Sequence, residues 1–142
     1  MYKIMLVEDD LTITEVLERQ LQKWGYLPSI VEDFNSVLEQ FEKEKPDLVL
    51  MDISLPSFNG YYWCQEIRKI SKIPIIFISS ADDDMNLVMA INMGADDFIP
   101  KPFKLEVVTA KIQALLRRTY AFTPETEVLK VRGLTLSVAD NT

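Results

Sequence analysis

Hydrophobic residues in this chain follow two alternating patterns. Short, mostly apolar runs of strand length stand at residues 3–7, 48–51, 75–78 and 98–99, and a weaker one at 27–31. Between these runs, apolar residues recur every three or four positions, as on one face of a helix. The first such segment carries Ile13, Val16, Leu17 and Leu21, and the second spans residues 34–41. Continuous apolar runs are typical of strands covered on both faces, as in a parallel sheet. The pattern therefore predicts a strand followed by a helix, five times over.

Capping residues and glycines give the expected limits of these helices. Thr12 followed by Glu15 fits a capping box at the start of the first helix. Gly25 separates that helix from the second strand, and Gly94 stops the fourth helix. The fifth helix is expected to end at residues 117–118, where two arginines suit the negative end of a helix dipole.

The third helix contains an aromatic run whose orientation can be predicted from its spacing. Tyr61, Cys64 and Ile67 share one helical face, so they are expected to face the core. Cys64 has no histidine beside it and is expected to be a buried, unreactive thiol. Tyr62 and Trp63 are then expected nearer the surface.

Strands that alternate with helices imply right-handed crossovers and a parallel sheet. Five repeats in this length suit an α/β fold of the flavodoxin-like kind, a doubly wound (βα)5 sheet with strand order 2-1-3-4-5. Residues 121–127 contain Pro124 and read as a linker, and residues 128–142 alternate like short strands. We therefore predict a complete domain at residues 1–120, a linker at 121–127 and the truncated start of a second domain at 128–142.

Composition narrows the possible chemistry. The chain has one cysteine and no histidine, which excludes an intrachain disulfide, a Ser-His-Asp relay, histidine-based metal sites and a phosphohistidine donor. No apolar run approaches the roughly 20 residues of a membrane helix, so a cytoplasmic location without membrane contact is expected. The net charge of −7 argues against non-specific DNA binding by this fragment.

Polar side chains gather where the predicted strands end. Charged or hydroxyl residues follow four of the five strands: Glu8, Asp9, Asp10, Asp52, Ser79, Ser80 and Lys101. In an open parallel sheet, ligands bind at the carboxyl ends of the strands. Each residue alone could be a helix cap, a loop residue or a solvated side chain, but their joint occurrence at one edge favours a functional site.

Close carboxylates repel one another, so they favour protonation or a cation. Oxygen ligands without histidine or thiolate point to Mg²⁺. Glu8, Asp9 and Asp52 would hold it, with the backbone carbonyl of Ser54.

A metal beside a carboxylate, a hydroxyl and an ammonium forms a phosphoryl-binding set. Asp52 is the natural nucleophile, because carboxylates form aspartyl-phosphates. Lys101 would neutralise the product, Ser79 would donate to one phosphoryl oxygen, and the backbone N–H of Ser80 could serve another.

These stretches resemble the receiver domain of bacterial two-component response regulators. The matching segments are residues 5–10 (MLVEDD), 48–56 (LVLMDISLP) with the later Gly60, 78–80 (ISS) and 94–103 (GADDFIPKPF). The resemblance implies that Asp52 is the phosphoacceptor, that Glu8 and Asp9 are the acidic metal pair, and that Ser79 and Lys101 are the switch hydroxyl and lysine. It also implies a cis Lys101–Pro102 bond. A receiver of this kind is not an enzyme with a separate substrate, since it catalyses its own phosphoryl transfer and dephosphorylation.

Further details resemble a subfamily. Residues 94–97 and 101–103, with the strand-like tail, are similar to regulators with a winged-helix DNA-binding domain, the OmpR/PhoB type. Residues 60–64 and 78–80 are similar to Bce/Gra-type regulators, which control resistance to cell-envelope-active antimicrobial peptides. The resemblance implies a sensor histidine kinase as partner, transcriptional output, and DNA binding through a missing C-terminal domain rather than through this fragment.

The same resemblance implies a switch and a homodimer. On phosphorylation Ser79 would move towards the phosphoryl group and Phe98, on the fifth strand, would turn inward into the vacated space. The dimer would form through the fourth helix, fifth strand and fifth helix. The residues expected on this face are Leu87, Asp96, Asp97, Val107, Lys111, Arg117 and Arg118.

Three alternatives differ in the residues they need. A phosphotransferase of the haloacid dehalogenase kind expects a second aspartate two residues after the nucleophile, where this chain has Ser54. A flavodoxin-like electron carrier would meet repulsion between its flavin phosphate and residues 8–10. A receiver-like module that is never phosphorylated would not need the complete set of acidic, hydroxyl and lysine residues.

Overall fold

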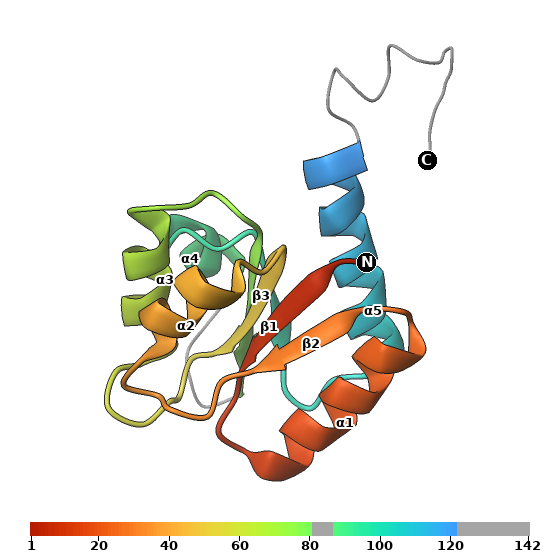
Figure 1. The fold of residues 1–142 in the computed structure, drawn as a ribbon, viewed down its shortest axis with the longest axis horizontal. Coiled ribbons are helices and arrows are strands. Elements are labelled where there is room, and N and C mark those ends of the chain that lie inside the picture. The colour runs from red at the N-terminus through yellow and green to blue at the C-terminus, as the bar shows by residue number, and fades with distance from the viewer. Residues whose placement is uncertain (81–86, 122–142) are drawn as a thin grey trace. The chain divides into compact units, whose positions relative to one another are not determined.

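The computed structural model describes residues 1–80 and 87–121, which form a five-stranded sheet flanked by helices (Figure 1). All neighbouring strands are parallel and lie in the order β2-β1-β3-β4-β5, which confirms the predicted flavodoxin-like fold. The strands are β1 (Lys3–Val7), β2 (Leu27–Ile30), β3 (Leu48–Asp52), β4 (Ile75–Ser79) and β5 (Asp97–Pro100).

The helices and the π-helical turn that follows them are α1 (Leu11–Lys23), α2 (Val37–Glu44), α3 (Gly60–Arg68), α4 (Leu87–Asn92), α5 (Leu105–Leu116) and η2 (Arg117–Ala121). The chain comprises two compact units, Met1–Thr109 and Ala110–Thr142. The predicted linker and second domain begin at the last described residue and otherwise lie outside the described part of the chain. Within that part, no helix has the length and apolarity needed to cross a bilayer.

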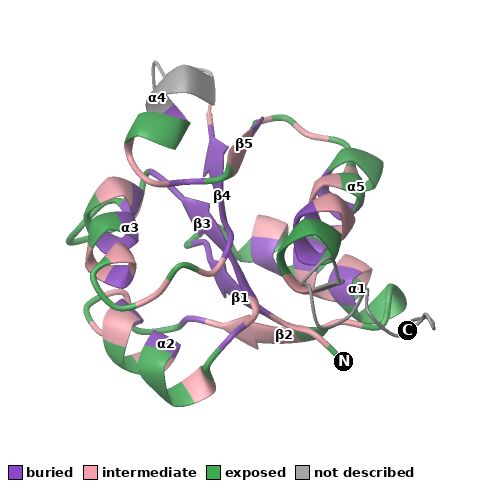
Figure 2. Cartoon of the chain, turned by 90° about the horizontal axis from the view of Figure 1, so that it is seen from above, coloured by how far each residue is buried: buried purple, intermediate pink, exposed green. Residues whose placement is uncertain are grey.

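The core follows from the apolar runs. Every residue of β3 and β4 is buried, as are residues 4–7 of β1, whereas the edge strands β2 and β5 are only partly buried (Figure 2). Helices α2 and α3 lie on one side of the sheet and α1 on the other (Figure 2). Near the start of α5, the Thr109 hydroxyl accepts a 3.0 Å hydrogen bond from Gln20 of α1. Coverage of both faces explains the absence of polar alternation in the central strands.

Several helix limits differ from those predicted. The N-cap of α1 is Asp10, whose carboxylate accepts hydrogen bonds from the backbone N–H groups of Thr12 (2.9 Å) and Ile13 (3.2 Å). The predicted Thr12–Glu15 capping box is therefore wrong, because Asp10, two residues before Thr12, is a strong cap. Helix α2 begins at Val37, and Phe34 packs against the core from the preceding turn.

Glycine positions and aromatic burial test the remaining predictions. Gly25 and Gly94 have φ values of 83° and 99°, as expected for residues that end helices in left-handed conformation. Tyr62 is 38% exposed, as predicted, but Trp63 is only 4% exposed and the prediction for it is wrong. The apolar stripe of α3 is wide enough to include Trp63 beside Cys64, which is buried as predicted.

Candidate functional site

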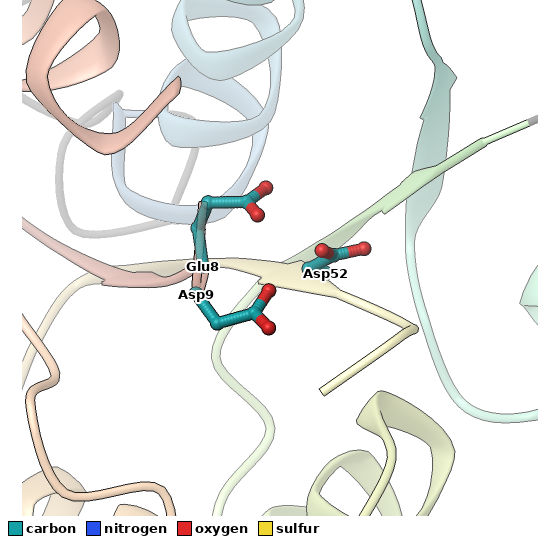
Figure 3. Close-up of side chains that lie close together, drawn as sticks. All are labelled: Glu8, Asp9 and Asp52. Atoms are coloured by element: carbon teal, nitrogen blue, oxygen red, sulfur yellow. The ribbon is translucent and has the colours of Figure 1, made fainter. Parts of the chain in front are cut away.

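The carboxyl ends of the strands meet at one edge of the sheet. Glu8 and Asp9 follow β1 directly, and Asp52 is the last residue of β3. Pairing of Val7 with Met51 sets these two strand ends side by side. One carboxylate oxygen from each acidic residue lies within 4.8 Å of the other two, and all three side chains point to the same space (Figure 3). The sheet order therefore assembles the predicted acidic group.

Lys101 reaches this group from the loop after β5. Its Nζ lies 3.2 Å from Asp52 Oδ2, to which it donates a hydrogen bond, and 3.2 Å from Glu8 Oε1. Its backbone N–H donates to the carbonyl of Ser79 at 2.6 Å, and its peptide bond to Pro102 is cis, as the resemblance implied. Burial opposes the charged ammonium, but the carboxylates of Asp52 and Glu8 outweigh it and raise the pKa of Lys101.

Glu8 is the most deeply buried carboxylate of the site, at 2% exposure. Its Oε2 accepts a hydrogen bond from the backbone N–H of Asp10 at 3.1 Å, and its backbone carbonyl accepts from the Thr14 hydroxyl at 3.0 Å. Burial, together with the hydrogen bond and negative charge of Asp52, raises the pKa of Glu8 to about 7. The Asp10 N–H and the charge of Lys101 act in the opposite direction but do not cancel it.

A cation would suit these carboxylates. Glu8 Oε1 is buried, and the Lys101 ammonium lies 3.2 Å from it. Two buried carboxylates that share one ammonium keep an excess of negative charge, which either a proton or a metal ion would neutralise. Asp9 is exposed and Asp52 is buried, so the group combines a solvent-facing oxygen with two enclosed ones. Oxygen-only donors of this kind fit a hard divalent cation.

Asp52 is held at both carboxylate oxygens. Its Oδ1 accepts a 3.3 Å hydrogen bond from the backbone N–H of Ser54, and its Oδ2 accepts from Lys101. Asp52 is 3% exposed, but it stands beside exposed Asp9 and exposed Ser54. The carboxylate is therefore fixed in orientation at the rim of the sheet.

The predicted hydroxyl and aromatic residues lie on the adjacent strands. Ser79 ends β4, is buried and donates a 3.1 Å hydrogen bond to the carbonyl of Ser80. Phe98 lies in β5, directly paired with Phe77, and its partly buried side chain packs against the core. Both residues therefore occupy strands next to the one that carries Asp52.

The residues predicted for a dimer face differ in their exposure and in their contacts within the chain. Asp96 Oδ2 accepts 2.9 Å hydrogen bonds from Arg68 Nη2 and from the backbone N–H of Ile75, so it already serves the fold of its own chain. Val107 is 41% exposed. Leu87 begins α4, but its side chain lies outside the described part of the structure. The remaining predicted residues are Asp97 in β5, Lys111 in α5, and Arg117 and Arg118 in η2.

Arg68 was not identified from the sequence. Its guanidinium donates to the carbonyls of Gly94 (2.8 Å) and Ile73 (2.7 Å) as well as to Asp96. The contacts with Gly94 and Asp96 tie the end of α3 to the segment before β5, and the contact with Ile73 ties it to the segment before β4. The only sequence feature that distinguishes Arg68 is its position as a basic residue at the end of a predicted helix, and many helices end in this way.

Comparison with known proteins shows similarity to response regulators over most of the chain. The response regulator receiver domain model matches residues 4–113. The chain is 52% identical over 141 residues to the uncharacterized transcriptional regulatory protein YvcP of Bacillus subtilis (strain 168), covering 96% of this chain and 60% of that protein. It is 48% identical over 143 residues to the sensory transduction protein BceR of Halalkalibacterium halodurans, covering 100% of this chain and 62% of that protein.

Among solved structures, the N-terminal domain of the nisin resistance regulator NsrR matches with a TM-score of 0.79 and 53% identity, over 82% of this chain and 99% of that chain. The chain spans about three-fifths of the length of the two relatives above. These similarities confirm the resemblance to Bce-type regulators. The chain belongs to the response regulator receiver domain family.

Proposed function

We propose that Asp52 accepts a phosphoryl group from a histidine of a partner sensor kinase, in a reaction that depends on Mg²⁺. The observation that carries this proposal is the placement of Asp52, buried at a strand end with Lys101 at 3.2 Å and the acidic group around it. Phosphoryl transfer needs mainly positioning and neutralisation of charge, and this site offers both.

The metal would be held by Glu8, Asp9 and Asp52, with the backbone carbonyl of Ser54. When bound, Mg²⁺ supplies positive charge against the phosphoryl oxygens. The close approach of the three carboxylates and the oxygen-only donor set support this assignment.

The side chains of this chain carry the remaining roles. An Asp52 oxygen forms a bond to phosphorus while the bond from phosphorus to the donor's histidine nitrogen breaks, leaving its electron pair on the imidazole. Lys101 already contacts Asp52 and would pair with a phosphoryl oxygen. Ser79 would turn from the Ser80 carbonyl, to which it now donates, towards a second oxygen, and the Ser80 N–H would bind a third.

Movement of the Ser79 side chain would change the conformation of Phe98. The phosphoryl group adds about −1.5 to −2 charge and three acceptor oxygens. As Ser79 moves, Phe98 would turn further into the core that it already contacts from β5. The face formed by α4, β5 and α5 is the element whose conformation would change.

This face would form a homodimer on phosphorylation, with residues drawn from Leu87, Asp97, Val107, Lys111, Arg117 and Arg118. Asp96, which binds Arg68 of its own chain, would contribute less to the pairs between subunits than the sequence suggested. Exposed ion pairs contribute little individually, so the apolar Val107 would add to the interface.

The kinase would dock beside α1. A groove of about 400 Å³ lies between α1 and the loop after β5, lined by Thr12, Ile13, Val16, Lys101, Pro102 and Phe103. Its lining is mostly apolar, and Lys101 belongs both to the groove and to the acidic site. A helix presenting a phosphohistidine from this groove would bring the phosphorus close to Asp52.

The whole protein would be a transcriptional regulator in antimicrobial-peptide resistance, acting on DNA through a winged-helix domain that follows residue 127. The similarity of this chain to the transcriptional regulatory protein YvcP and to the nisin resistance regulator NsrR supports this proposal. The receiver domain itself would be limited to residues 1–120, followed by the linker at 121–127.

Incubation with acetyl phosphate tests the proposed chemistry without the kinase. With Mg²⁺, intact mass spectrometry should show an adduct of about 80 Da, the mass of one phosphoryl group. The adduct should be absent with EDTA and in Asp52→Asn. An adduct that persists in Asp52→Asn would move the phosphoacceptor elsewhere, and no adduct in the parent protein would reject the proposed function.

A further inference from the structure

Gly60, the first residue of α3, lies against the main chain of the residue proposed to be phosphorylated. A Cβ at this position would stand 2.4 Å from the Asp52 carbonyl oxygen, 3.0 Å from Ile53 Cα and 3.2 Å from the Asp52 carbonyl carbon. Real Cβ atoms essentially never approach other heavy atoms closer than 3.0 Å. Any side chain here therefore requires the backbone at the end of β3 or the start of α3 to move.

The reason for this glycine is space and not backbone conformation. Gly25 and Gly94 have positive φ values, whereas Gly60 does not. A Cβ on Gly25 would meet nothing within 4 Å, and one on Gly94 would meet the Arg68 side chain at 3.2 Å. Of the described glycines, only Gly60 would press on backbone atoms at less than 3.0 Å.

The contact also closes the loop that carries the proposed backbone ligand. The chain leaves β3 at Ile53 and returns at Gly60, whose N–H donates a 2.9 Å hydrogen bond to the Ile53 carbonyl. Within this loop the Leu55 N–H donates to the same carbonyl at 3.1 Å, and the Ser54 N–H donates to Asp52 Oδ1 at 3.3 Å. The Asp52 carboxylate and the Ser54 carbonyl are thus both attached to a short segment clamped at Gly60.

We propose that Gly60 is a positioning residue for the metal and phosphoryl site, because its missing side chain lets α3 fix the main chain of Asp52 and Ile53. This inference rests on the proposed function of Asp52. It extends that function by naming a residue that contacts neither metal nor phosphoryl group and acts through the backbone.

The expected effect follows from the distances. In Gly60→Ala, the separation of 2.4 Å must open beyond 3.0 Å, which moves the Asp52 main chain, the helix start or both by several tenths of an ångström. Metal–ligand distances tolerate only about 0.2 Å, and loss of outer contacts that orient ligands weakens metal binding roughly 10- to 100-fold. Gly60→Ala should therefore weaken Mg²⁺ binding by roughly tenfold or more.

The test compares Gly60→Ala with Gly94→Ala, a second glycine substitution that would meet the Arg68 side chain and not the Asp52 backbone. Mg²⁺ affinity is measured by calorimetric titration, and phosphorylation by acetyl phosphate is followed at saturating Mg²⁺. In metal-free protein, the amide resonances of Ile53 and Ser54 report the backbone shift directly. Circular dichroism establishes that each variant is folded, and trimethylamine N-oxide is added to any variant that is not.

Gly60→Ala should weaken Mg²⁺ binding, slow phosphorylation and shift the two amide resonances. Gly94→Ala should lose stability but keep the parent's Mg²⁺ affinity. Parent-like Mg²⁺ affinity in folded Gly60→Ala would overturn the inference, as would an equal loss of affinity in Gly94→Ala. If the parent protein itself neither binds Mg²⁺ nor becomes phosphorylated, the proposed function fails first, and that outcome is distinct from a failure confined to Gly60.

Discussion

The buried Glu8–Asp52 pair gives the metal-free protein an unusual dependence of stability on pH. Folding raises the pKa of Glu8 from 4.5 to about 7, chiefly by burial and by the neighbouring Asp52. The folded protein therefore holds the proton more tightly than the unfolded chain does. The resulting stabilisation is fully present below about pH 4.5 and is lost as the pH rises through about 7.

The size of this effect follows from the shift. Each pKa unit corresponds to about 1.4 kcal/mol, so Glu8 can contribute roughly 3 kcal/mol to the free energy of unfolding. This is a large fraction of the stability of a domain of this size, which is about 5–15 kcal/mol. Lys101 does not obscure it, because the raised pKa of that lysine acts only at much higher pH.

Urea denaturation in EDTA at a series of pH values between about 5 and 8 measures the effect. The free energy of unfolding of the parent protein should fall across this range by up to about 3 kcal/mol more than that of Glu8→Gln, whose amide cannot ionise. Glu15→Gln, which changes an exposed carboxylate on α1, is the matched control and should keep the parent's slope. Saturating Mg²⁺ should reverse the trend, because the metal binds the ionised carboxylates.

Two results would refute this reasoning. The first is a Glu8→Gln variant with the same slope as the parent, which would assign the pH dependence to other groups. The second is metal-free parent protein whose stability is level or rises between about pH 5 and 7, which would mean that Glu8 ionises normally within the fold.

Further predictions concern single side chains. Lys101→Met should slow phosphorylation of the Mg²⁺-bound protein by acetyl phosphate roughly 100-fold, because the donor to the phosphoryl oxygen is lost. Stopped-flow or quench measurements yield the rate, and an unchanged rate would exclude this role of Lys101. Arg68→Ala should lower the free energy of unfolding by about 1–3 kcal/mol, since it removes the donor to two partly buried carbonyls. Lys69→Ala, which removes an exposed ion pair, should cost less than about 1 kcal/mol in the same urea titration. Cys64, whose pKa burial raises to about 11, should resist alkylation by iodoacetamide at neutral pH until the protein unfolds; rapid labelling of folded protein would contradict its burial.

The fold was predictable because its central strands are hydrophobic on both faces. The runs at β3 and β4 contain no polar residue before their last position, and such runs fit few structures other than buried parallel strands. The helix limits were less predictable, because several polar residues compete to cap each start. Asp10 and not Thr12 caps α1, because the position of the cap depends on where β1 ends and the helix can begin.

The acidic site was predictable for a different reason. The carboxyl ends of parallel strands lie at one edge of the sheet, so residues at or just after the ends of β1, β3 and β5 converge once the strand order is known. The unequal environments of Glu8 and Asp9, one buried and one exposed, were not predictable, because they depend on side-chain packing. Sequence spacing likewise gave no sign that Gly60 touches the Asp52 backbone, since that contact depends on how α3 settles against the sheet.

The position of the phosphoryl group tests the central claim most directly. Borohydride reduces an aspartyl-phosphate to homoserine, so protein treated with acetyl phosphate and Mg²⁺, reduced and digested can be read by tandem mass spectrometry. Homoserine should occur at residue 52, and it should be absent when either acetyl phosphate or Mg²⁺ is omitted. Reduction at Glu8 or Asp9 instead, or no reduced residue in the folded protein, would contradict the assignment of Asp52 as the phosphoacceptor.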